Sequence, residues 1–281
     1  MATQTPGQQE KSERFLSLHA GDRPLLMPNP WDRGSARLLE SLGFEALATT
    51  SSGFAATLGR LDGSVTRNEA IAHAAWIAAG TDLPVSADLE NCFADDPEGV
   101  AETVRLAVGA GLAGCSVEDY ANRDENPIYE RELAAERVTA AADAAHGGPV
   151  RLVLTARAEN YVRGRPYLAD TIARLQAYQE AGADVLFAPG VTKAEEIQEL
   201  VASVDRPVNV LALPGTPPVA ELAAIGVKRV SVGGAFAFFA LDALAYAARE
   251  LRENGSYGYW DRARSGAAAA RAAFGAGPAP G

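Results

Sequence analysis

The stretch SADLE (residues 86–90) ends an apolar run and carries two acidic residues at its close. Two later stretches, SVEDY (residues 116–120) and TARAE (residues 155–159), have the same form and are each followed by a loop and a helical pattern. A short apolar run that ends in charge and precedes a helix is typical of a buried parallel strand. The three stretches therefore predict strand–loop–helix units with polar groups at the strand ends.

The same alternation of apolar runs and Ala- and Leu-rich helical patterns extends over most of the chain. The glycine of AGAD (residues 181–184) ends one such helix before the next run begins. Eight units of this kind predict an α/β fold, a (β/α)8 TIM-type barrel. A doubly wound open sheet is the alternative, although an early Gly-rich dinucleotide fingerprint is absent. The predicted strands are residues 25–28, 46–50, 85–88, 114–118, 150–155, 184–188, 208–212 and 229–232.

The chain of 281 residues is 48% hydrophobic, which suits one large core. We expect a single barrel domain over residues 1–260 with a mobile N-terminus, and a C-terminal helical extension with a Gly/Ala/Pro tail over residues 261–281. The formal charge of −11 argues against nucleic acid and anionic membranes as partners. No signal peptide or membrane-spanning run is expected, and the two cysteines fit a reducing cytoplasm.

Acidic residues follow the third and fourth predicted strands. Because side chains alternate along a strand, we expect Asp88 and Glu90 to point the same way and Glu118 to reach the same rim. Carboxylates gathered at one rim repel each other unless a cation joins them, and oxygen ligands suit a hard ion. Asp88, Glu90 and Glu118 therefore predict a Mg²⁺ site, with Mn²⁺ as a possible substitute. The alternative is that they are helix caps or surface carboxylates.

Two further features lie after predicted strands. Alternation places Arg157 in the same mouth, where it would clamp a substrate carboxylate or form a structural ion pair with Glu118 or Glu159. The Ser-Ser-Gly turn at residues 51–53 offers N–H groups and hydroxyls to an anion, or is simply a turn.

The two cysteines are not expected to act in catalysis. Strand parity turns Cys115 outward, against the helices, which predicts a packing role. Cys92 falls in the loop after the third strand, close to the mouth. No histidine follows a strand, so none is a good acid or base candidate.

The order of these motifs resembles the isocitrate lyase/phosphoenolpyruvate mutase superfamily over roughly residues 25–236. The motifs are Asn-x-Trp-Asp, Thr-Ser-Ser-Gly, Asp-x-Glu, Glu-Asp and Ala-Arg-x-Glu, one after each of the first five strands. The resemblance implies a (β/α)8 barrel whose last helix is swapped between subunits of a homodimer or homotetramer. It also implies Mg²⁺ and a 2-oxo acid substrate whose C–C or P–C bond is made or broken.

The resemblance assigns roles to individual residues. Asp88, Glu90 and Glu118 match the carboxylates that hold Mg²⁺, directly or through water. Asp62 matches an acidic residue near the metal and the leaving group. The implied substrate-binding residues are Trp31, Ser52, Gly53, Phe54, Arg157 and Asn209, and the implied catalytic residues are Asp62, Tyr120, Asn126 and Arg157.

The loop YANRDENP (residues 120–127) departs from the superfamily pattern. It has no Cys, Lys or His, whereas the isocitrate and methylisocitrate lyases carry a Cys there and the phosphonate enzymes carry two Lys. Asp124 falls on the loop Lys, and an Asp that faces a transferring phosphoryl group is electrostatically unfavourable. Only Asn126 lines up with the loop Asn of the phosphonate enzymes.

We therefore expect a Mg²⁺-dependent lyase or decarboxylase acting on a small 2-oxo (di)carboxylate such as oxaloacetate or a methylisocitrate-like acid. The proton would come from Tyr120, Asp62 or a metal-bound water. One alternative is a P–C bond enzyme of the phosphonopyruvate or phosphoenolpyruvate mutase type. Another is a non-catalytic 2-oxo acid binding protein.

Overall fold

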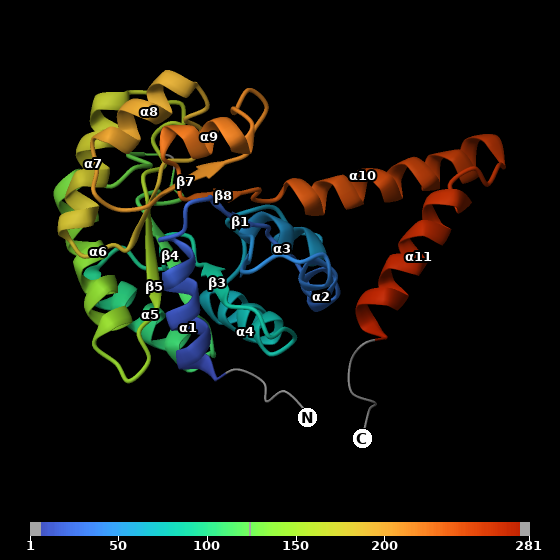
Figure 1. Cartoon of the computed structure of the whole chain (residues 1–281), viewed down its shortest axis with the longest axis horizontal. Coiled ribbons are helices and arrows are strands. Elements are labelled where there is room, and N and C mark those ends of the chain that lie inside the picture. Colours follow the sequence, from blue (N-terminus) through green and yellow to red (C-terminus); the bar gives the residue numbers. More distant parts are fainter. Residues whose placement is uncertain (1–6, 124, 276–281) are drawn as a thin grey trace.

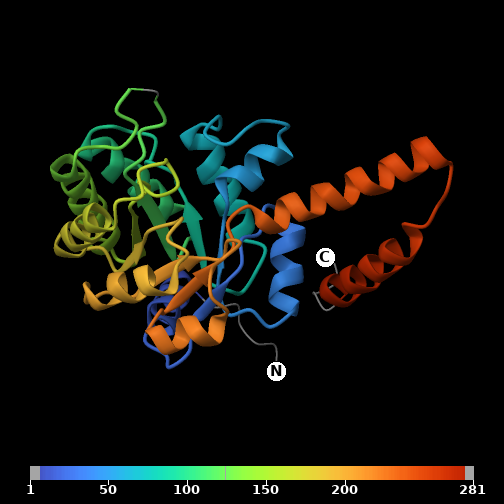
Figure 2. The ribbon, with the colours of Figure 1, turned by 90° about the horizontal axis from the view of Figure 1, so that it is seen from above.

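The computed structural model describes residues 7–123 and 125–275. Eight parallel strands form one sheet in the order β1-β8-β7-β6-β5-β4-β3-β2, and helices surround it (Figures 1 and 2). This arrangement confirms the predicted (β/α)8 barrel and excludes the doubly wound alternative. The strands are β1 (Leu25–Met27), β2 (Leu47–Ala48), β3 (Val85–Asp88), β4 (Gly114–Glu118), β5 (Val153–Arg157), β6 (Val185–Phe187), β7 (Val208–Leu211) and β8 (Arg229–Ser231).

The barrel closes between β1 and β2 through contacts at the strand ends. The Ala48 N–H donates to the Pro28 carbonyl at 3.1 Å, just beyond β1. Asn29 joins three strand ends, because its Nδ2 donates to the Thr49 carbonyl while its Oδ1 accepts from the N–H groups of Val232 and Gly233. One buried amide thus holds together the mouth where the sheet has no regular ladder.

Helices follow the strands as the alternation predicts, and polar residues begin several of them. Thr66 and Glu69 form a capping box at the start of α4, and Asp96 caps α5. The helices that surround the barrel are α2 (Arg33–Ser41), α3 (Ser51–Thr57), α4 (Arg67–Ala78), α5 (Pro97–Gly109), α6 (Arg131–His146), α7 (Leu168–Glu180), α8 (Ala194–Ala202) and α9 (Val219–Ile225).

Helix α1 (Gln8–Leu18) covers the end of the barrel opposite the mouth. Its Phe15 is fully buried in a small apolar cluster with Leu25 and Met27 of β1. Its Ser12 hydroxyl donates to the Ala113 carbonyl at 3.2 Å. The prediction of a mobile N-terminus was wrong from Gln8 onward, because this helix buries an aromatic ring; residues 1–6 lie outside the described residues.

The C-terminal helices form an arm that projects from the barrel. Helix α10 (Ala235–Arg249) continues into a π-helical segment, η1 (Glu250–Asn254), and α11 (Trp260–Phe274) returns toward α2. There the Phe274 ring lies 5.7 Å from the Arg37 guanidinium. The helical extension therefore begins well before residue 261, while residues 276–281 of the predicted tail lie outside the described residues. Within the described part of the chain, no helix is long and apolar enough to cross a membrane.

Candidate functional site

Arg157 is the centre of the mouth. It is the last residue of β5, and its guanidinium contacts three carboxylates: Asp88 at 2.9 Å, Glu118 at 3.1 Å and Glu159 at 2.7 Å. The ladder between β4 and β5 sets Glu118 directly beside Arg157. The structural ion pairs considered from the sequence are therefore both present, and Arg157 still lines the cavity described below.

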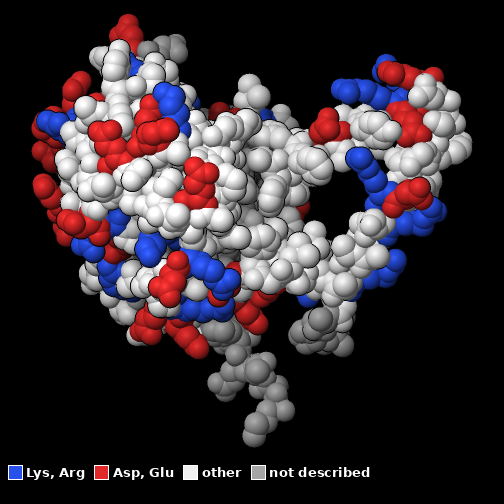
Figure 3. Space-filling model, turned by 45° about the horizontal axis from the view of Figure 1, so that its top comes forward, with Lys and Arg blue, Asp and Glu red and all other residues white. Residues whose placement is uncertain are grey.

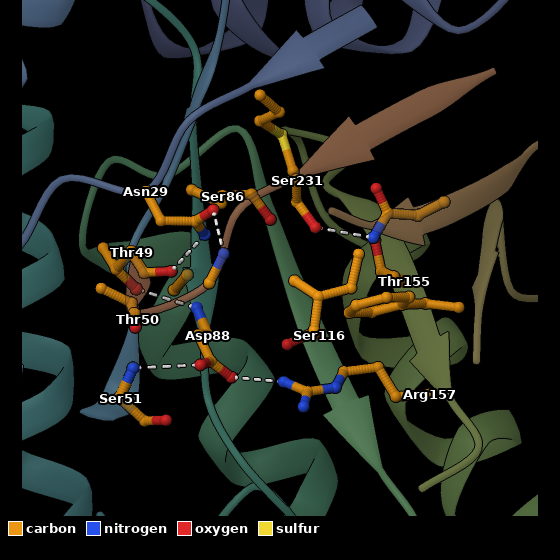
Figure 4. Close-up of a pocket in the computed structure, with 18 of the residues that line it drawn as sticks. Asn29, Thr49, Thr50, Ser51, Ser86, Asp88, Ser116, Thr155, Arg157 and Ser231 are labelled. Atoms are coloured by element: carbon orange, nitrogen blue, oxygen red, sulfur yellow. Dashed lines mark hydrogen bonds and ion pairs between the residues drawn. The ribbon is translucent and has the colours of Figure 1, made fainter. Parts of the chain in front are cut away.

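Asp88 links β3 to the start of α3. One of its carboxylate oxygens accepts from Arg157, and the other accepts from the Ser51 N–H at 3.0 Å. Its own N–H donates to the Thr49 hydroxyl at 2.9 Å. Figure 4 shows Asp88 between Ser51 and Arg157, with the carboxylate directed across the mouth. Contacts with Thr49, Ser51 and Arg157 therefore fix the orientation of Asp88.

Glu90 reaches the mouth by a different route from the one predicted. Strand β3 ends at Asp88, and Glu90 has a left-handed backbone with φ of 50°. The strand-alternation argument was therefore wrong for Glu90, although its carbonyl accepts from the Glu118 N–H at 3.0 Å. Its Oε1 is buried and has no hydrogen-bond partner among the described residues. Burial, followed by the charges of Asp88 and Asp62, raises the pKa of Glu90 to about 8.

A cavity of about 140 Å³ lies above Arg157 and is lined by acidic and polar groups. Tyr120 lies there in the loop after β4, and the guanidinium of Arg163 covers its ring at 3.4 Å. Burial raises the pKa of Asp62, and the Ser51 hydroxyl partly opposes this shift. The lining residues are Ser51, Asp62, Gly63, Glu90, Glu118, Tyr120, Asn122, Arg157 and Arg163.

A second cavity of about 200 Å³ runs from the mouth into the barrel (Figure 4). Asp62, Ser51 and Arg157 line both cavities, so the two are continuous at the mouth. The walls of the deeper cavity are mostly short polar side chains instead of the branched apolar residues that usually fill such barrels. They include Asn29, Ser86, Ser116, Thr155, Asn209, Arg229 and Ser231.

The Ser-Ser-Gly turn is only partly free to bind an anion. The Ser51 N–H is taken by Asp88, and the Gly53 N–H is directed to the Thr50 hydroxyl at 3.3 Å. Ser52 lines the deeper cavity. Phe54 turns toward α4 and stacks on His73, with ring centroids 3.8 Å apart.

The remaining predicted substrate residues fall into two groups. Asn209 is 1% exposed and lines the deeper cavity, where its Nδ2 donates to the Ser231 hydroxyl at 2.9 Å. Trp31 lines a shallow surface groove with Phe54 instead of the two mouth cavities. Asn126 is exposed and lines neither cavity, whereas Asn122 of the same loop lines the upper one.

The two cysteines are buried in the apolar core and line neither of the two mouth cavities. Cys115 is fully buried in the core between strands and helices, as its strand parity predicts, and its pKa is raised by burial. Cys92 is also fully buried, and burial raises its pKa to about 12. A thiol with so high a pKa is a poor nucleophile near neutral pH.

Three charged residues near the mouth and the deeper cavity were not predicted from the sequence as site residues, although Glu159 was considered as an ion-pair partner of Arg157. Glu159 is 1% exposed and pairs with both Arg157 and Arg163, so it orients two guanidinium groups at once. Arg163 lies after β5 in a segment without a regular pattern, so no periodicity indicated it. Arg229 begins β8, where a charged residue resembles a surface strand end, yet it is only 3% exposed.

The residues present fit a hard divalent cation held largely through water. No group of three or more His, Cys, Asp or Glu residues in the described part of the chain is placed to hold a metal ion, so three direct side-chain ligands are not in position. However, Glu90 Oε1 has no partner in the described residues, and Glu90 borders this cavity with the carboxylates of Asp62 and Glu118 and the guanidinium groups of Arg157 and Arg163. Mg²⁺ prefers oxygen ligands and retains several waters in proteins.

A family model described as phosphoenolpyruvate phosphomutase matches residues 15–252. The chain belongs to the phosphoenolpyruvate phosphomutase family. The match spans the barrel and helix α10 of the arm, and it confirms the resemblance inferred from the motifs.

Members of this family and its superfamily resemble the chain over most of its length. The Mycobacterium tuberculosis "Uncharacterized protein Rv1998c" is 34% identical over 241 residues, which cover 85% of this chain and 89% of that protein. A crystal structure from Burkholderia cenocepacia J2315, described as a candidate lyase/mutase, is 49% identical with a TM-score of 0.92, and covers 96% of this chain and 97% of its own. Oxaloacetate acetylhydrolase in complex with oxalate is 25% identical with a TM-score of 0.81, and the match covers 90% of each chain.

Carbon–carbon bond enzymes occur among the other relatives. The 2-methylisocitrate lyase of Escherichia coli is 28% identical over 227 residues, or 77% of this chain and 74% of that enzyme. The structure of 2,3-dimethylmalate lyase is 27% identical with a TM-score of 0.79, and covers 88% of this chain and 89% of its own. The family therefore lies within a superfamily of lyases and mutases that act on small organic acids.

Proposed function

We propose that this protein is a Mg²⁺-dependent lyase that cleaves the C–C bond next to the oxo or hydroxy group of a small 2-oxo (di)carboxylate. Oxaloacetate and methylisocitrate-like acids represent the substrate class. The proposal depends on one observation: four carboxylates, from Asp62, Asp88, Glu90 and Glu118, surround the cavity mouth at Arg157. Arg157 and Arg163 offset part of this negative charge, and a further cation would let the site accept an anionic substrate.

Asp88, Glu90 and Glu118 would hold Mg²⁺, or Mn²⁺ in its place, in part through water. The ion would supply positive charge that stabilises negative charge developing on the oxo oxygen of the substrate. The buried Glu90 Oε1, which has no hydrogen-bond partner in the described residues, supports this assignment, because a buried polar atom normally has a partner.

Arg157 would orient the substrate carboxylate. Its guanidinium is held by Asp88, Glu118 and Glu159 and lines both cavities, so its position is fixed before an anion arrives. Asn209 and Ser52 line the same cavity and would contact the remaining polar groups of the substrate.

Asp62 is the better placed of the two side chains considered as the acid or base. It lines both cavities, and burial raises the pKa of its carboxyl group, which favours the protonated form more than in an exposed aspartate. Tyr120 lines only the upper cavity, where the Arg163 guanidinium covers its ring. We assign proton transfer to Asp62, with Tyr120 closing the upper cavity.

The partners we propose are a small 2-oxo acid and a second copy of the chain. The arm exposes large apolar side chains along α10, including Phe239 at 72% and Leu244 at 65%. Figure 3 shows an opening between the arm and the barrel, bordered mainly by uncharged residues. A homodimer or homotetramer in which arms pack on neighbouring subunits would cover these side chains.

The test is turnover of a substrate panel by the purified protein. With Mg²⁺, we expect cleavage of oxaloacetate or a methylisocitrate-like acid, loss of activity with EDTA, and recovery when the ion is added in excess. Glu98→Gln, an exposed carboxylate paired with Arg105, should behave as the wild type. Turnover of phosphonopyruvate alone would favour the P–C bond alternative, and tight binding of 2-oxo acids without any turnover would favour a binding protein.

A further inference from the structure

Arg229 is a buried cation without a carboxylate partner. It begins β8, is 3% exposed, and forms no ion pair among residues 7–123 and 125–275. Its Nη1 donates to the Thr155 hydroxyl at 3.1 Å and lies 3.4 Å from His19 Nε2. Its Nε–H is buried without an acceptor in the described residues. An unpaired buried charge is costly, so a charge kept in this position calls for a counter-charge.

The surroundings of Arg229 increase this cost. Burial, followed by the positive charge of Arg157, lowers the pKa of Arg229 to about 9. The neighbouring imidazole of His19 is neutral near pH 7, because burial and Arg229 lower its pKa to about 3. Among the described residues, no acidic group pairs with Arg229.

The guanidinium faces a space that could hold an anion. Arg229 and Thr155 both line the deeper cavity, which is continuous with Arg157 and Asp88 at the mouth. Short hydroxyl side chains, such as Ser86 and Ser116, leave about 200 Å³ open where a barrel is usually packed with branched residues. The Oδ1 atom of the buried Asn209 is a second polar atom that has no partner in the described residues.

We propose that Arg229 and Thr155 form a second anion subsite at the floor of the cavity, which binds the distal carboxylate of a dicarboxylate substrate. This inference rests on the proposed function, which places the 2-oxo end of the substrate at the mouth. Thr155 and Arg157 lie two residues apart on β5, a rise of roughly 6.6 Å. The two ends of the substrate would therefore lie at different depths of the same cavity, near Arg157 and near Thr155.

The distal carboxylate would then convert an unfavourable buried cation into a buried ion pair with charge-assisted hydrogen bonds. A monoacid of the same length would leave Arg229 unpaired and would bind more weakly. The subsite thus makes the enzyme selective for diacids over isosteric monoacids.

Matched pairs of ligands test this inference in the presence of Mg²⁺. The pairs are malate with 2-hydroxybutyrate, and 2-oxoglutarate with 2-oxovalerate, and oxalate serves as a short probe of the mouth alone. By titration calorimetry, we expect the wild type to bind the diacid of at least one pair roughly 10- to 100-fold more tightly than its monoacid. Arg229→Met should bring this ratio close to one and leave the affinity for oxalate within about 2-fold.

Thermal unfolding without ligand separates a binding role from a structural one. Arg229→Met should unfold at the same temperature as the wild type or higher, because it removes an unpaired buried charge. Thr155→Val, a nearly isosteric change, should lower the diacid preference in part, and Arg229→Lys should retain part of it. Arg14→Met, at an exposed arginine on α1, is the matched control and should alter neither the ratio nor the unfolding temperature.

Two results would overturn the subsite while leaving the proposed function intact. One is tight oxalate binding without a diacid preference in either pair. The other is a diacid preference that persists in Arg229→Met. Failure of oxalate to bind with Mg²⁺ would instead contradict the proposed function itself, so the two failures are distinguishable.

Discussion

Arg157 and Asp88 are joined by an ion pair of 2.9 Å across the mouth of the barrel, from the end of β5 to the end of β3. The same Asp88 carboxylate accepts the first N–H of α3, so one side chain connects the guanidinium, a helix start and the proposed metal-binding region. Asp88 therefore has two roles, as a structural partner of Arg157 and as a proposed ligand.

Asp88→Asn should separate these roles. The amide keeps the size of the side chain and can still accept from the Ser51 N–H, so the fold should persist, but the charge needed to bind a cation is lost. We expect activity to fall by about 100-fold or more, with a similar loss of Mg²⁺ affinity. Steady-state kinetics and circular dichroism would measure both effects, and activity equal to the wild type would remove Asp88 from the site.

Arg157→Met should destabilise the protein. The change removes the cation from between Asp88, Glu118 and Glu159 and leaves these buried carboxylates to repel each other. Breaking a buried pair in this way costs about 3–5 kcal/mol of the free energy of unfolding. Urea denaturation at neutral pH would measure the loss.

The double variant Arg157→Met/Glu118→Gln is the control for that interpretation. Burial already raises the pKa of Glu118, so a neutral amide should restore about 1 kcal/mol or more of the lost stability. No difference between the single and double variants would show that charge repulsion is not the cause.

His19 should make stability depend on pH. Its folded-state pKa of about 3 lies below the usual value of 6.5, so the unfolded chain binds a proton that the folded chain rejects. The stability that the neutral His19 contributes should therefore be fully present above pH 6.5. Below this pH, the free energy of unfolding should fall by up to ~1.4 kcal/mol per pH unit. Urea denaturation between pH 7.5 and 4.5 would give the slope, and His19→Gln should reduce it; an unchanged slope would contradict the assignment.

The arm should hold subunits together. Phe239→Asp or Leu244→Asp places a charge on the most exposed apolar part of α10 and should convert the oligomer into monomers. Light scattering coupled to size-exclusion chromatography would measure the mass. Leu106→Asp, at a partly exposed leucine on α5, is the matched control and should leave the mass unchanged. A wild-type protein that is monomeric at micromolar concentration would contradict the proposal.

Much of the barrel could be predicted from the sequence because its strands are short, apolar and evenly spaced. The third and fourth strands agree with their predicted bounds, and both end in the carboxylates that indicated a site. The fifth strand was predicted over residues 150–155 but spans Val153–Arg157, because Val150 belongs to the loop that precedes it. Strand periodicity therefore located Asp88, Glu118 and Arg157 correctly at the mouth.

Other features depend on backbone geometry and long-range contacts that periodicity does not encode. Glu90 leaves the strand through a left-handed conformation, so alternation could not give its direction. Arg229 lies at a strand start, and its inward orientation follows only from the closed barrel, which places it beside Thr155 of β5. Phe15 is buried because α1 covers the end of the barrel opposite the mouth. The polar composition of the first residues did not indicate this packing.

The most direct test of the account is calorimetric titration of the metal-free protein with Mg²⁺ or Mn²⁺, with and without oxalate. The account predicts that each chain binds one ion, that oxalate strengthens this binding, and that Asp88→Asn abolishes it. If neither ion binds, even in the presence of oxalate, the carboxylates at the mouth do not form a metal site and the proposed mechanism is contradicted.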